Sequence, residues 1–503
     1  ACTNDTIILL DGTYYEDSLE IKKNLVIGSQ YLFDNDTNHI AATIIDGEND
    51  GWIMRWTVGS GSWSDTTSSQ LVGFTISNGS STASSSYGGA LSIWGSTALK
   101  ISNIRFINNT ASHGGALRVH GSARATMNEV LFKNNSANYG GAIYSSTAYF
   151  VMNNVEITGN SSTQSYAAMY LNAYSLASRN INVHHNTTSS SYVVRMYFMN
   201  LQSTPTMRDW KVQHNASSGR TLQLERVPSS YNLILENALI TDNIVTNEYP
   251  GLQTRYLFGK VTVVNSTIAN NNSVNQSTSH GGAPIYLEYS QTSSVVNILN
   301  TIVRTDGSSS IEANNSVEYT LNVNNSFVSG GQLAIDLPSI TTINFDTTNL
   351  TSGLYFTDAA NGDYSLSNVS TLLGAGASTA TVGGISITAP TTDLYGNPRP
   401  NPSGTNPDIG AIESPESAPQ VGIAAVTTDN GFCQTTSGAI TANLLNYTGT
   451  ATYAWSSSTY PTWTWNATQS ATGLSSGDYK VVAIDATSGA KIDSTEITIA
   501  TLP

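Results

Sequence analysis

The sequence predicts an all-β protein: a parallel β-solenoid of 25–29 residues per coil, followed by a small β-sandwich. Three observations lead to this fold class. A short motif recurs at a nearly constant spacing through the middle of the chain, and a fixed period in this range is typical of stacked structural units. The composition of the repeat favours strands over helices. A Pro- and Ser-rich stretch then precedes a segment of short, alternating strands.

The repeating motif has the form apolar-x-x-Asn. Its apolar residues are Phe106, Phe132, Ile157, Val183, Val212, Ile240 and Ile268. Its asparagines, which we predict to form a structural ladder, are Asn109, Asn135, Asn160, Asn186, Asn215, Asn243 and Asn271, at spacings of 26, 25, 26, 29, 28 and 28 residues. Three residues before the apolar position stand Asn103, Glu129, Asn154, Asn180, Asp209, Asn237 and Asn265. Seven units in register predict a solenoid.

The residue types indicate which solenoid this is. The units are rich in Val, Ile, Thr, Tyr and Ser, with alternating apolar and polar positions, and they show no apolar stripe of helical period. About 25 residues suit one turn of a three-faced parallel β-coil, in which like residues of successive coils stack about 4.8 Å apart. We therefore expect the asparagines to stack as a column, each amide donating to one neighbour and accepting from the other. We also expect Phe106 and Phe132 to stack in the core.

The repeat resembles that of known families. Gly-Gly-Ala-Ile/Leu at Gly114 and Gly140, paired with Phe-x-x-Asn, is similar to the repeat of chlamydial polymorphic outer-membrane proteins. More broadly it resembles right-handed parallel β-helix, pectin-lyase-like surface proteins of bacteria. Segments 6–14 and 43–47 resemble the first coils of such proteins, and segments 361–366, 392–399 and 408–413 resemble their closing segment. The resemblance implies a right-handed β-helix over 1–413, with irregular coils over 1–100, regular coils over 101–330 and a closing segment over 331–413.

A second domain is expected at the C-terminus. Residues 414–420 form a linker by composition, and residues 421–503 alternate in short strands, as in an Ig-like β-sandwich. Trp455, the stretch from Gly473 to Tyr479, and Asp485 resemble the repeat of gliding-motility adhesins of Bacteroidota. That family usually carries a Cys shortly after the Asp. This chain has Ala486-Thr487-Ser488 there, so Cys433 lacks the usual partner.

Composition excludes some classes of function. The net charge of −15, with only 11% charged residues, argues against binding nucleic acid or anionic membranes. No apolar run is long enough to span a membrane. Many Ser, Thr and Asn residues, few Lys and long polar strands fit a secreted, cell-surface location, and the frequent Asn-x-Ser/Thr triplets make glycosylation possible. Metal-binding Cys motifs are absent.

Candidate site residues concentrate between 179 and 256. For a carbohydrate groove we single out Arg195, Arg208, Asp209, Trp210, Lys211, His214, Arg226 and Tyr256, because charged groups and aromatic rings on successive coils suit a polysaccharide. The other interpretation is a solvated face with scattered charges. His185 and His214 precede the ladder asparagines of adjacent coils and should stack; we expect no metal there.

Evidence for catalysis is weak in the sequence. No paired carboxylates at a convincing spacing occur, so we assign no catalytic residues and no cofactor. Asp46–Asp50 and Asp358–Asp363 could collect oxygen ligands for Ca²⁺, although both segments are also typical turns.

These observations predict a secreted, non-catalytic surface protein, an adhesin or a subunit of an extracellular fibre. The alternative is a polysaccharide lyase or another carbohydrate-active or carbohydrate-binding protein. Partners would be other copies of the chain, cell-surface components or a polysaccharide. Thr6 to Leu10 reads as a buried strand with no coil before it. We expect a further segment or a neighbouring copy to cover this end, because an open coil exposes unpaired backbone groups.

Overall fold

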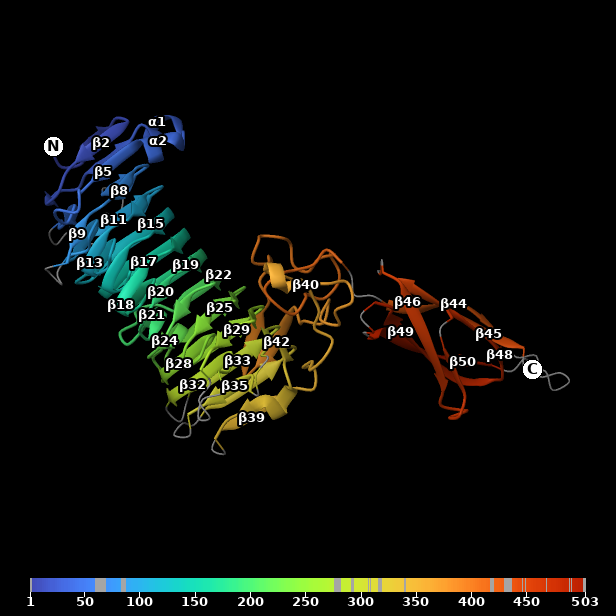
Figure 1. The fold of residues 1–503 in the computed structure, drawn as a ribbon. Coiled ribbons are helices and arrows are strands. Elements are labelled where there is room, and N and C mark those ends of the chain that lie inside the picture. Colours follow the sequence, from blue (N-terminus) through green and yellow to red (C-terminus); the bar gives the residue numbers. More distant parts are fainter. Residues whose placement is uncertain are drawn as a thin grey trace. The chain divides into compact units, whose positions relative to one another are not determined.

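The computed structural model describes residues 2–58, 69–82, 87–275, 282–290, 294–305, 307, 309–314, 319–338, 341–416, 420–428, 437–445, 447, 449–466, 468–487, 489 and 491–500. It is a right-handed parallel β-helix up to residue 349, as the repeat predicts (Figure 1). Each coil runs through three strands that pair in parallel with the corresponding strands of the coils before and after. We call the three columns of strands the first, second and third face, in chain order.

Most strands belong to a single face. The first face contains β1 (Thr6–Leu9), β4 (Val26–Ser29), β7 (Gln70–Val72), β11 (Ala98–Ser102), β25 (Asn232–Glu236), β29 (Lys260–Val264), β33 (Val295–Leu299), β36 (Thr320–Asn324) and β39 (Thr342–Phe345). The second contains β2 (Gly12–Tyr15), β5 (Thr43–Asp46), β8 (Thr75–Ser77), β12 (Arg105–Ile107), β26 (Leu239–Thr241), β30 (Thr267–Ala269), β34 (Ile302–Val303) and β37 (Phe327–Val328). The third contains β3 (Leu19–Ile21), β6 (Met54–Trp56), β10 (Leu91–Trp94), β14 (Leu117–His120), β21 (Tyr192–Tyr197), β24 (Arg220–Glu225), β28 (Leu252–Leu257), β32 (Ile285–Ser290), β35 (Ile311–Ala313) and β38 (Ile335–Asp336).

Four longer strands continue across faces. β15 (Ala123–Lys133) and β22 (Thr206–Gln213) cover the first and second faces, while β17 (Ile143–Thr158) and β19 (Met169–His184) cover all three. A separate sheet is formed by short strands, all of which except the first directly follow a ladder asparagine: β9 (Ser80–Ser81), β13 (Thr110–His113), β16 (Ser136–Tyr139), β18 (Ser161–Ser165), β20 (Thr187–Thr188), β23 (Ala216–Ser217), β27 (Ile244–Val245) and β31 (Asn272–Ser273). Helices are short: α1 (Tyr31–Asp34), α2 (Asn38–Ala42), η1 (Gly331–Ala334) and η2 (Ala359–Asn361).

The bend between the first and second faces explains why Asn, Asp or Glu recurs three residues before the apolar residue of the motif. Asn103, Asn154, Asn180 and Asn237 adopt positive φ angles of 51–54°. Glu129 and Asp209, at the same position of other coils, also adopt positive φ, 54° and 56°. Asn and Asp tolerate this left-handed conformation better than other residues with a side chain, which accounts for their recurrence.

The ladder asparagines stack in one buried column. The backbone N–H and the side-chain Nδ2 of Asn135 both donate to Oδ1 of Asn160, at 2.8 and 2.9 Å. Oδ1 of Asn135 in turn accepts from the same two groups of Asn109, at 2.9 and 3.0 Å. Nδ2 of Asn135 also donates to the Phe106 carbonyl at 3.0 Å. The pattern repeats through Asn186, Asn215, Asn243 and Asn271, so each corner satisfies its own buried polar groups.

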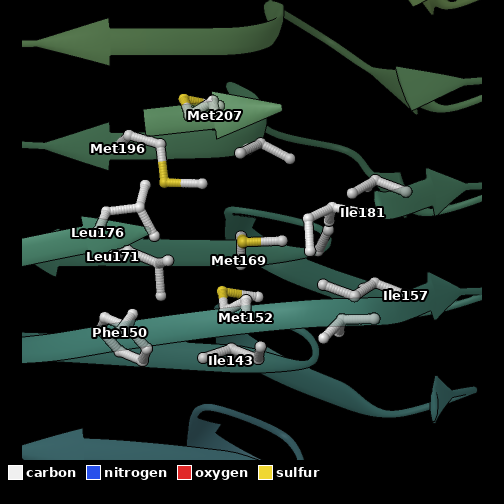
Figure 2. Close-up of a cluster of buried hydrophobic side chains, with 14 of the residues drawn as sticks. Ile143, Phe150, Met152, Ile157, Met169, Leu171, Leu176, Ile181, Met196 and Met207 are labelled. Atoms are coloured by element: carbon white, nitrogen blue, oxygen red, sulfur yellow. The ribbon is translucent and has the colours of Figure 1, made fainter. Parts of the chain in front are cut away.

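The core inside the coils is apolar and stacked in register. Phe106 and Phe132 are fully buried, with ring centroids 4.9 Å apart and planes 11° apart. Figure 2 shows the interior of later coils, where Met152, Met169, Met196 and Met207 fill the space between the strands together with aliphatic side chains. Flexible methionine side chains suit a core whose coil length changes from one turn to the next.

The N-terminal coil is less buried than expected. The residues of β1 are exposed or half-buried, and Leu10 is 59% exposed. In the part of the chain that the structure describes, β1 pairs with β4.

Tertiary contacts divide the chain into two units, residues 1–349 with 380–387, and residues 350–379 with 388–503. This differs from the boundary at 413 predicted above. β42 (Thr379–Val382) and β43 (Ile385–Thr388) pair with each other, and their residues 380–387 belong to the first unit, where Val382 and Ile387 pack on Val264 and Leu299. The closing segment therefore contributes one piece to the β-helix, and the rest of it groups with the C-terminal residues.

The second unit contains the remaining closing segment and two antiparallel sheets. β40 (Phe356–Asp358) pairs with β41 (Asp363–Leu366). Further along, the fully buried pair Arg399–Glu413, with Nε and Oε2 2.7 Å apart, organises residues 393–414. One sheet contains β44 (Gln420–Thr427), β45 (Gly438–Leu445) and β48 (Ser470–Leu474). The other contains β46 (Ala451–Ser457), β47 (Thr464–Asn466), β49 (Gly477–Asp485) and β50 (Lys491–Ile499). Buried residues of both sheets share one core around Trp455; an Ig-like topology stays a prediction. Residues 417–419 of the predicted linker and Cys433 lie outside the described residues.

Candidate functional site

The third face carries an unusual set of outward side chains. Alternation along β14 buries Leu117 and Val119 and turns Arg118 and His120 outward, where both are half-buried. Parallel pairing then places Tyr144, Tyr170, Arg195 and Gln223 in line with Arg118 on successive coils. We define the aromatic face as the outward side chains of this region and of the turns before it: Tyr87, Trp94, His113, Arg118, His120, Tyr139, Tyr144, Tyr166, Tyr170, Tyr192, Arg195 and Tyr197.

The rings of the aromatic face contact one another along the coils. Tyr144 and Tyr170 lie 5.1 Å apart between centroids, and Tyr170 lies 4.8 Å from Tyr166. Tyr166 continues to Tyr192 at 5.6 Å, while His113 lies 4.9 Å from Tyr139. For rings on neighbouring coils, the separation follows from the spacing of about 4.8 Å between parallel strands. Tyr166 and Tyr170 belong to one coil, where Tyr166 stands in the turn just before β19. The rings are half-buried, so part of each remains accessible to solvent.

Arg195 is embedded among these rings. Its guanidinium carbon lies 5.5–5.9 Å from the centroids of Tyr166, Tyr170, Tyr192 and Tyr197. Nη1 donates to the Tyr166 hydroxyl at 2.8 Å, and Nε donates to Oε2 of the buried Glu225, also at 2.8 Å. The Glu225 carboxylate and the Tyr166 hydroxyl raise the pKa of Arg195, although burial opposes them. Arg195 is therefore a fixed, charge-compensated part of the surface.

Further along the third face, other arginines are also paired with carboxylates. Nη2 of Arg220 lies 3.2 Å from Oε2 of Glu288, and Nε of Arg255 lies 3.6 Å from the same oxygen. The charges in this part of the face thus largely cancel.

The structure divides the predicted groove residues into two groups. Arg195, Arg226 and Tyr256 lie together along the third face: the Arg226 guanidinium stands 5.7 Å from the ring of Tyr197, a member of the aromatic face, and 5.0 Å from the ring of Tyr256. Tyr256 stacks on Tyr289 at 5.2 Å. This group extends the aromatic face beyond Arg195.

The other predicted residues lie on and just after β22, on the first and second faces. Trp210 is fully buried and its indole N–H donates to Ser178 Oγ at 3.0 Å, so it is a core residue that a ligand cannot reach. Asp209 occupies the left-handed bend, where it accepts a hydrogen bond from Arg179 at 2.9 Å. Arg208 pairs with Glu236 at 2.7 Å.

The last two predicted groove residues of the β22 group, Lys211 and His214, lie on the second face and in the turn after it. Lys211 is half-buried on β22, and the ring centroid of the exposed His214 lies 5.3 Å from that of His185, with the two rings tilted by 32°. The eight residues therefore do not form one groove, because three lie along the third face, the others belong to β22 and the turn after it, and Trp210 is in the core.

Sequence reasoning missed the larger part of the aromatic face. Tyr139, Tyr144, Tyr166, Tyr170 and Arg118 precede residue 179, outside the interval chosen for its density of charge. The repeat itself could have revealed these outward residues. Arg118 and Tyr144 each stand directly after the apolar residue that follows Gly-Gly-Ala. Alternation within a strand turns that position outward.

The two candidate Ca²⁺ segments are hydrogen-bonded turns. Asp46 accepts from the backbone N–H of Glu48 at 2.9 Å and from Nδ2 of Asn78. Asp358 caps η2 by accepting from Nδ2 of Asn361 at 2.7 Å and from its backbone N–H. Among the residues that the structure describes, no cluster of three or more His, Cys, Asp or Glu side chains is arranged to hold a metal ion.

Comparison with known proteins agrees with this architecture. Residues 89–268 match the family model described as "Right handed beta helix region". This interval contains most of the aromatic face and six of the seven ladder asparagines. No curated protein and no solved structure matches the chain. Within the described ranges, no helix is long and apolar enough to cross a membrane.

Proposed function

We propose that the chain is a non-catalytic surface protein that binds a polysaccharide along the aromatic face. The observation that carries the proposal is the run of half-buried rings that contact one another along the coils, with arginines between them. A pyranose ring offers an apolar C–H surface and polar hydroxyl edges. Tyrosine and arginine side chains match both, because each combines a flat surface with a hydrogen-bonding tip.

The direction of the face suits a polymer. Like positions recur about every 4.8 Å along the coils, so the rings form a linear series. A stalk whose only task was mechanical would not need half-exposed aromatic side chains in series, since contiguous exposed apolar surface favours unwanted association. A cell-surface location fits the polar, Lys-poor composition and the resemblance of the C-terminal residues to gliding-motility adhesin repeats. Association with other copies of the chain is a further part of this proposal.

Carboxylates near the aromatic face do not offer acid–base chemistry of the usual glycosidase type. Glu225 is held by Arg195, and Glu288 by Arg220 and Arg255. A glycosidase needs one carboxyl group that stays protonated and a second one at a set distance across the scissile bond. The geometry therefore supports binding better than turnover.

The test is affinity electrophoresis and calorimetry with a panel of neutral and acidic polysaccharides. Replacing both Tyr144 and Tyr170 by Ala should weaken binding about 10-fold or more, because each ring contact contributes about 0.5–1.5 kcal/mol and 1.4 kcal/mol is tenfold. The matched control replaces Tyr149 and Tyr174, a pair with centroids 5.5 Å apart on the first face, and should bind like the wild type.

Two results would contradict the proposal. If no polysaccharide binds, or if both double variants lose affinity equally, the aromatic face is not the binding surface. Sustained release of unsaturated products or new reducing ends would show an enzyme instead. Loss of that turnover on replacing Arg208, Asp209 or Lys211 would place the reaction on β22.

A further inference from the structure

Arg118 differs from the other arginines of the third face because no carboxylate compensates it. Its guanidinium lies 5.2 Å from the Tyr144 ring, and its Nε and Nη1 are buried without a hydrogen-bond partner. Among the described residues, no Asp or Glu lies within ion-pair distance of it. Burial lowers the pKa of Arg118, yet a guanidinium stays charged at any physiological pH. A half-buried, uncompensated cation is costly unless something outside the chain pairs with it.

The described groups around Arg118 that the following contacts identify are uncharged. Its neighbours in register are Ser92 and Tyr144. Burial, followed by the charge of Arg118 itself, lowers the pKa of both His113 and His120, so these rings are neutral near pH 7. The local charge is therefore positive in a chain whose net charge is −15.

A second unpaired donor lies on the same side of the neighbouring coil. Trp94 pairs in register with His120, two residues from Arg118, and its ring centroid lies 4.7 Å from the ring of His120. Its indole Nε1 is buried without a partner. Buried donors of this kind cost free energy unless an acceptor reaches them. Two adjacent coils thus contain buried donors without acceptors.

We propose that Arg118 binds a single anionic substituent, a carboxylate or a sulfate, on the saccharide that lies along the aromatic face. The inference rests on the function proposed above. Guanidinium groups bind both anions through charge-assisted N–H···O bonds, and Nη2 of Arg118 is not one of its buried, unpartnered nitrogens. Farther along the third face, Arg195, Arg220 and Arg255 are already paired with glutamates, so an anionic group of the ligand gains less there than at Arg118.

The test compares acidic polymers with their neutral derivatives. The probes are hyaluronan, carboxyl-reduced hyaluronan, a sulfated galactan and the same galactan after desulfation. Each is titrated into the wild-type chain, into Arg118→Gln and into the control Arg124→Gln. Arg124 also stands over a tyrosine, with its guanidinium carbon 5.6 Å from the Tyr149 ring, but on the first face. The control therefore removes the same charge from a similar setting. Circular dichroism and thermal unfolding check that each variant is folded.

The wild type should bind at least one acidic probe about 10- to 100-fold more tightly than its neutral derivative, the range for hydrogen bonds to a charged group. Arg118→Gln should lose that preference while keeping the affinity for the neutral derivative, and Arg124→Gln should keep both. Loss on carboxyl reduction would identify a carboxylate, and loss on desulfation a sulfate.

Three results would overturn the inference. The role of Arg118 is refuted if the wild type binds the neutral derivatives as tightly as the acidic probes. If the Tyr144 and Tyr170 double variant also abolishes that binding, polysaccharide binding on the aromatic face is still supported. The inference also fails if a folded Arg118→Gln keeps the full preference for the acidic probe. If none of the four polymers binds, the inference falls together with polysaccharide binding on this face.

Discussion

Replacing Asn135 by Ala tests whether the asparagine column stabilises the coils. In the folded chain Oδ1 of Asn135 accepts from the buried backbone N–H and from Nδ2 of Asn109, and its own Nδ2 donates to Asn160 and to the Phe106 carbonyl. Alanine removes all of these side-chain bonds. Nδ2 of Asn109 retains acceptors at the carbonyls of Ile76 and Ile107, both at 3.1 Å, whereas the Asn109 backbone N–H loses the partner that the structure shows for it.

The expected loss of stability follows from the unpaired backbone N–H of Asn109. A buried donor left without a partner costs about 1–3 kcal/mol, and the remaining losses are partly shared by other acceptors. We therefore expect the free energy of unfolding to fall by about 1–3 kcal/mol. Asn128→Ala is the matched control, since Asn128 is an exposed residue of the same strand, β15. A surface substitution of that kind should stay within about 0.5 kcal/mol.

Urea denaturation followed by tryptophan fluorescence measures the change in stability, and amide hydrogen exchange measures it locally. Local measurement is needed because a solenoid can unfold coil by coil rather than in one step. Protection of the Asn109 N–H should drop in Asn135→Ala and remain unchanged in Asn128→Ala. Equal effects of the two substitutions would show that the column contributes no more than any surface asparagine, and the argument from buried polar groups would be refuted.

Three further predictions concern the core, the bend and the pH dependence. Phe132→Ala should cost about 3–5 kcal/mol in urea denaturation, whereas a cost below about 1 kcal/mol would show that its ring is not packed as the structure has it. Asn154, with φ of 52°, should tolerate Gly, while Val should cost about 1–2 kcal/mol by thermal unfolding because a β-branched residue resists this conformation; equal melting temperatures would contradict this. The pKa values of His113 and His120 should lie below 6.5. Because the unfolded chain binds these protons more readily, stability should decline as the pH falls below about 6.5 towards the lowered pKa values; NMR titration midpoints at or above 6.5 would disprove it.

Much of the fold could be predicted because the same sequence pattern recurs in each coil of a solenoid. The spacing of Phe106, Phe132 and the ladder asparagines fixed the length of the coil. Alternation of residue type identified its strands, whereas the left-handed backbone at Asn103 and Asn154 was recognised only in the structure. These features are local, so each coil restates them within about 25 residues.

The candidate site was much less predictable. The density of charge in residues 179–256 led to Arg208 and Trp210, which lie on another face or inside the core. Charge density along the chain does not reveal which of three faces a side chain occupies. One left-handed residue, Asp209, turns the strand and separates neighbours in sequence onto different surfaces.

The sequence by itself determined the period of this protein, its strands and its buried ladder, because these depend on residue types that recur from coil to coil. Only the tertiary structure decided that Tyr144, Tyr170 and Arg195 stand in one line and that, among the described residues, Nε and Nη1 of Arg118 find no hydrogen-bond partner. Such facts depend on pairing between residues about 26 positions apart and on which carboxylates reach which arginines. Parallel stacking converts a distance of one coil along the chain into about 4.8 Å in space, so the aromatic face exists only once the coils are stacked.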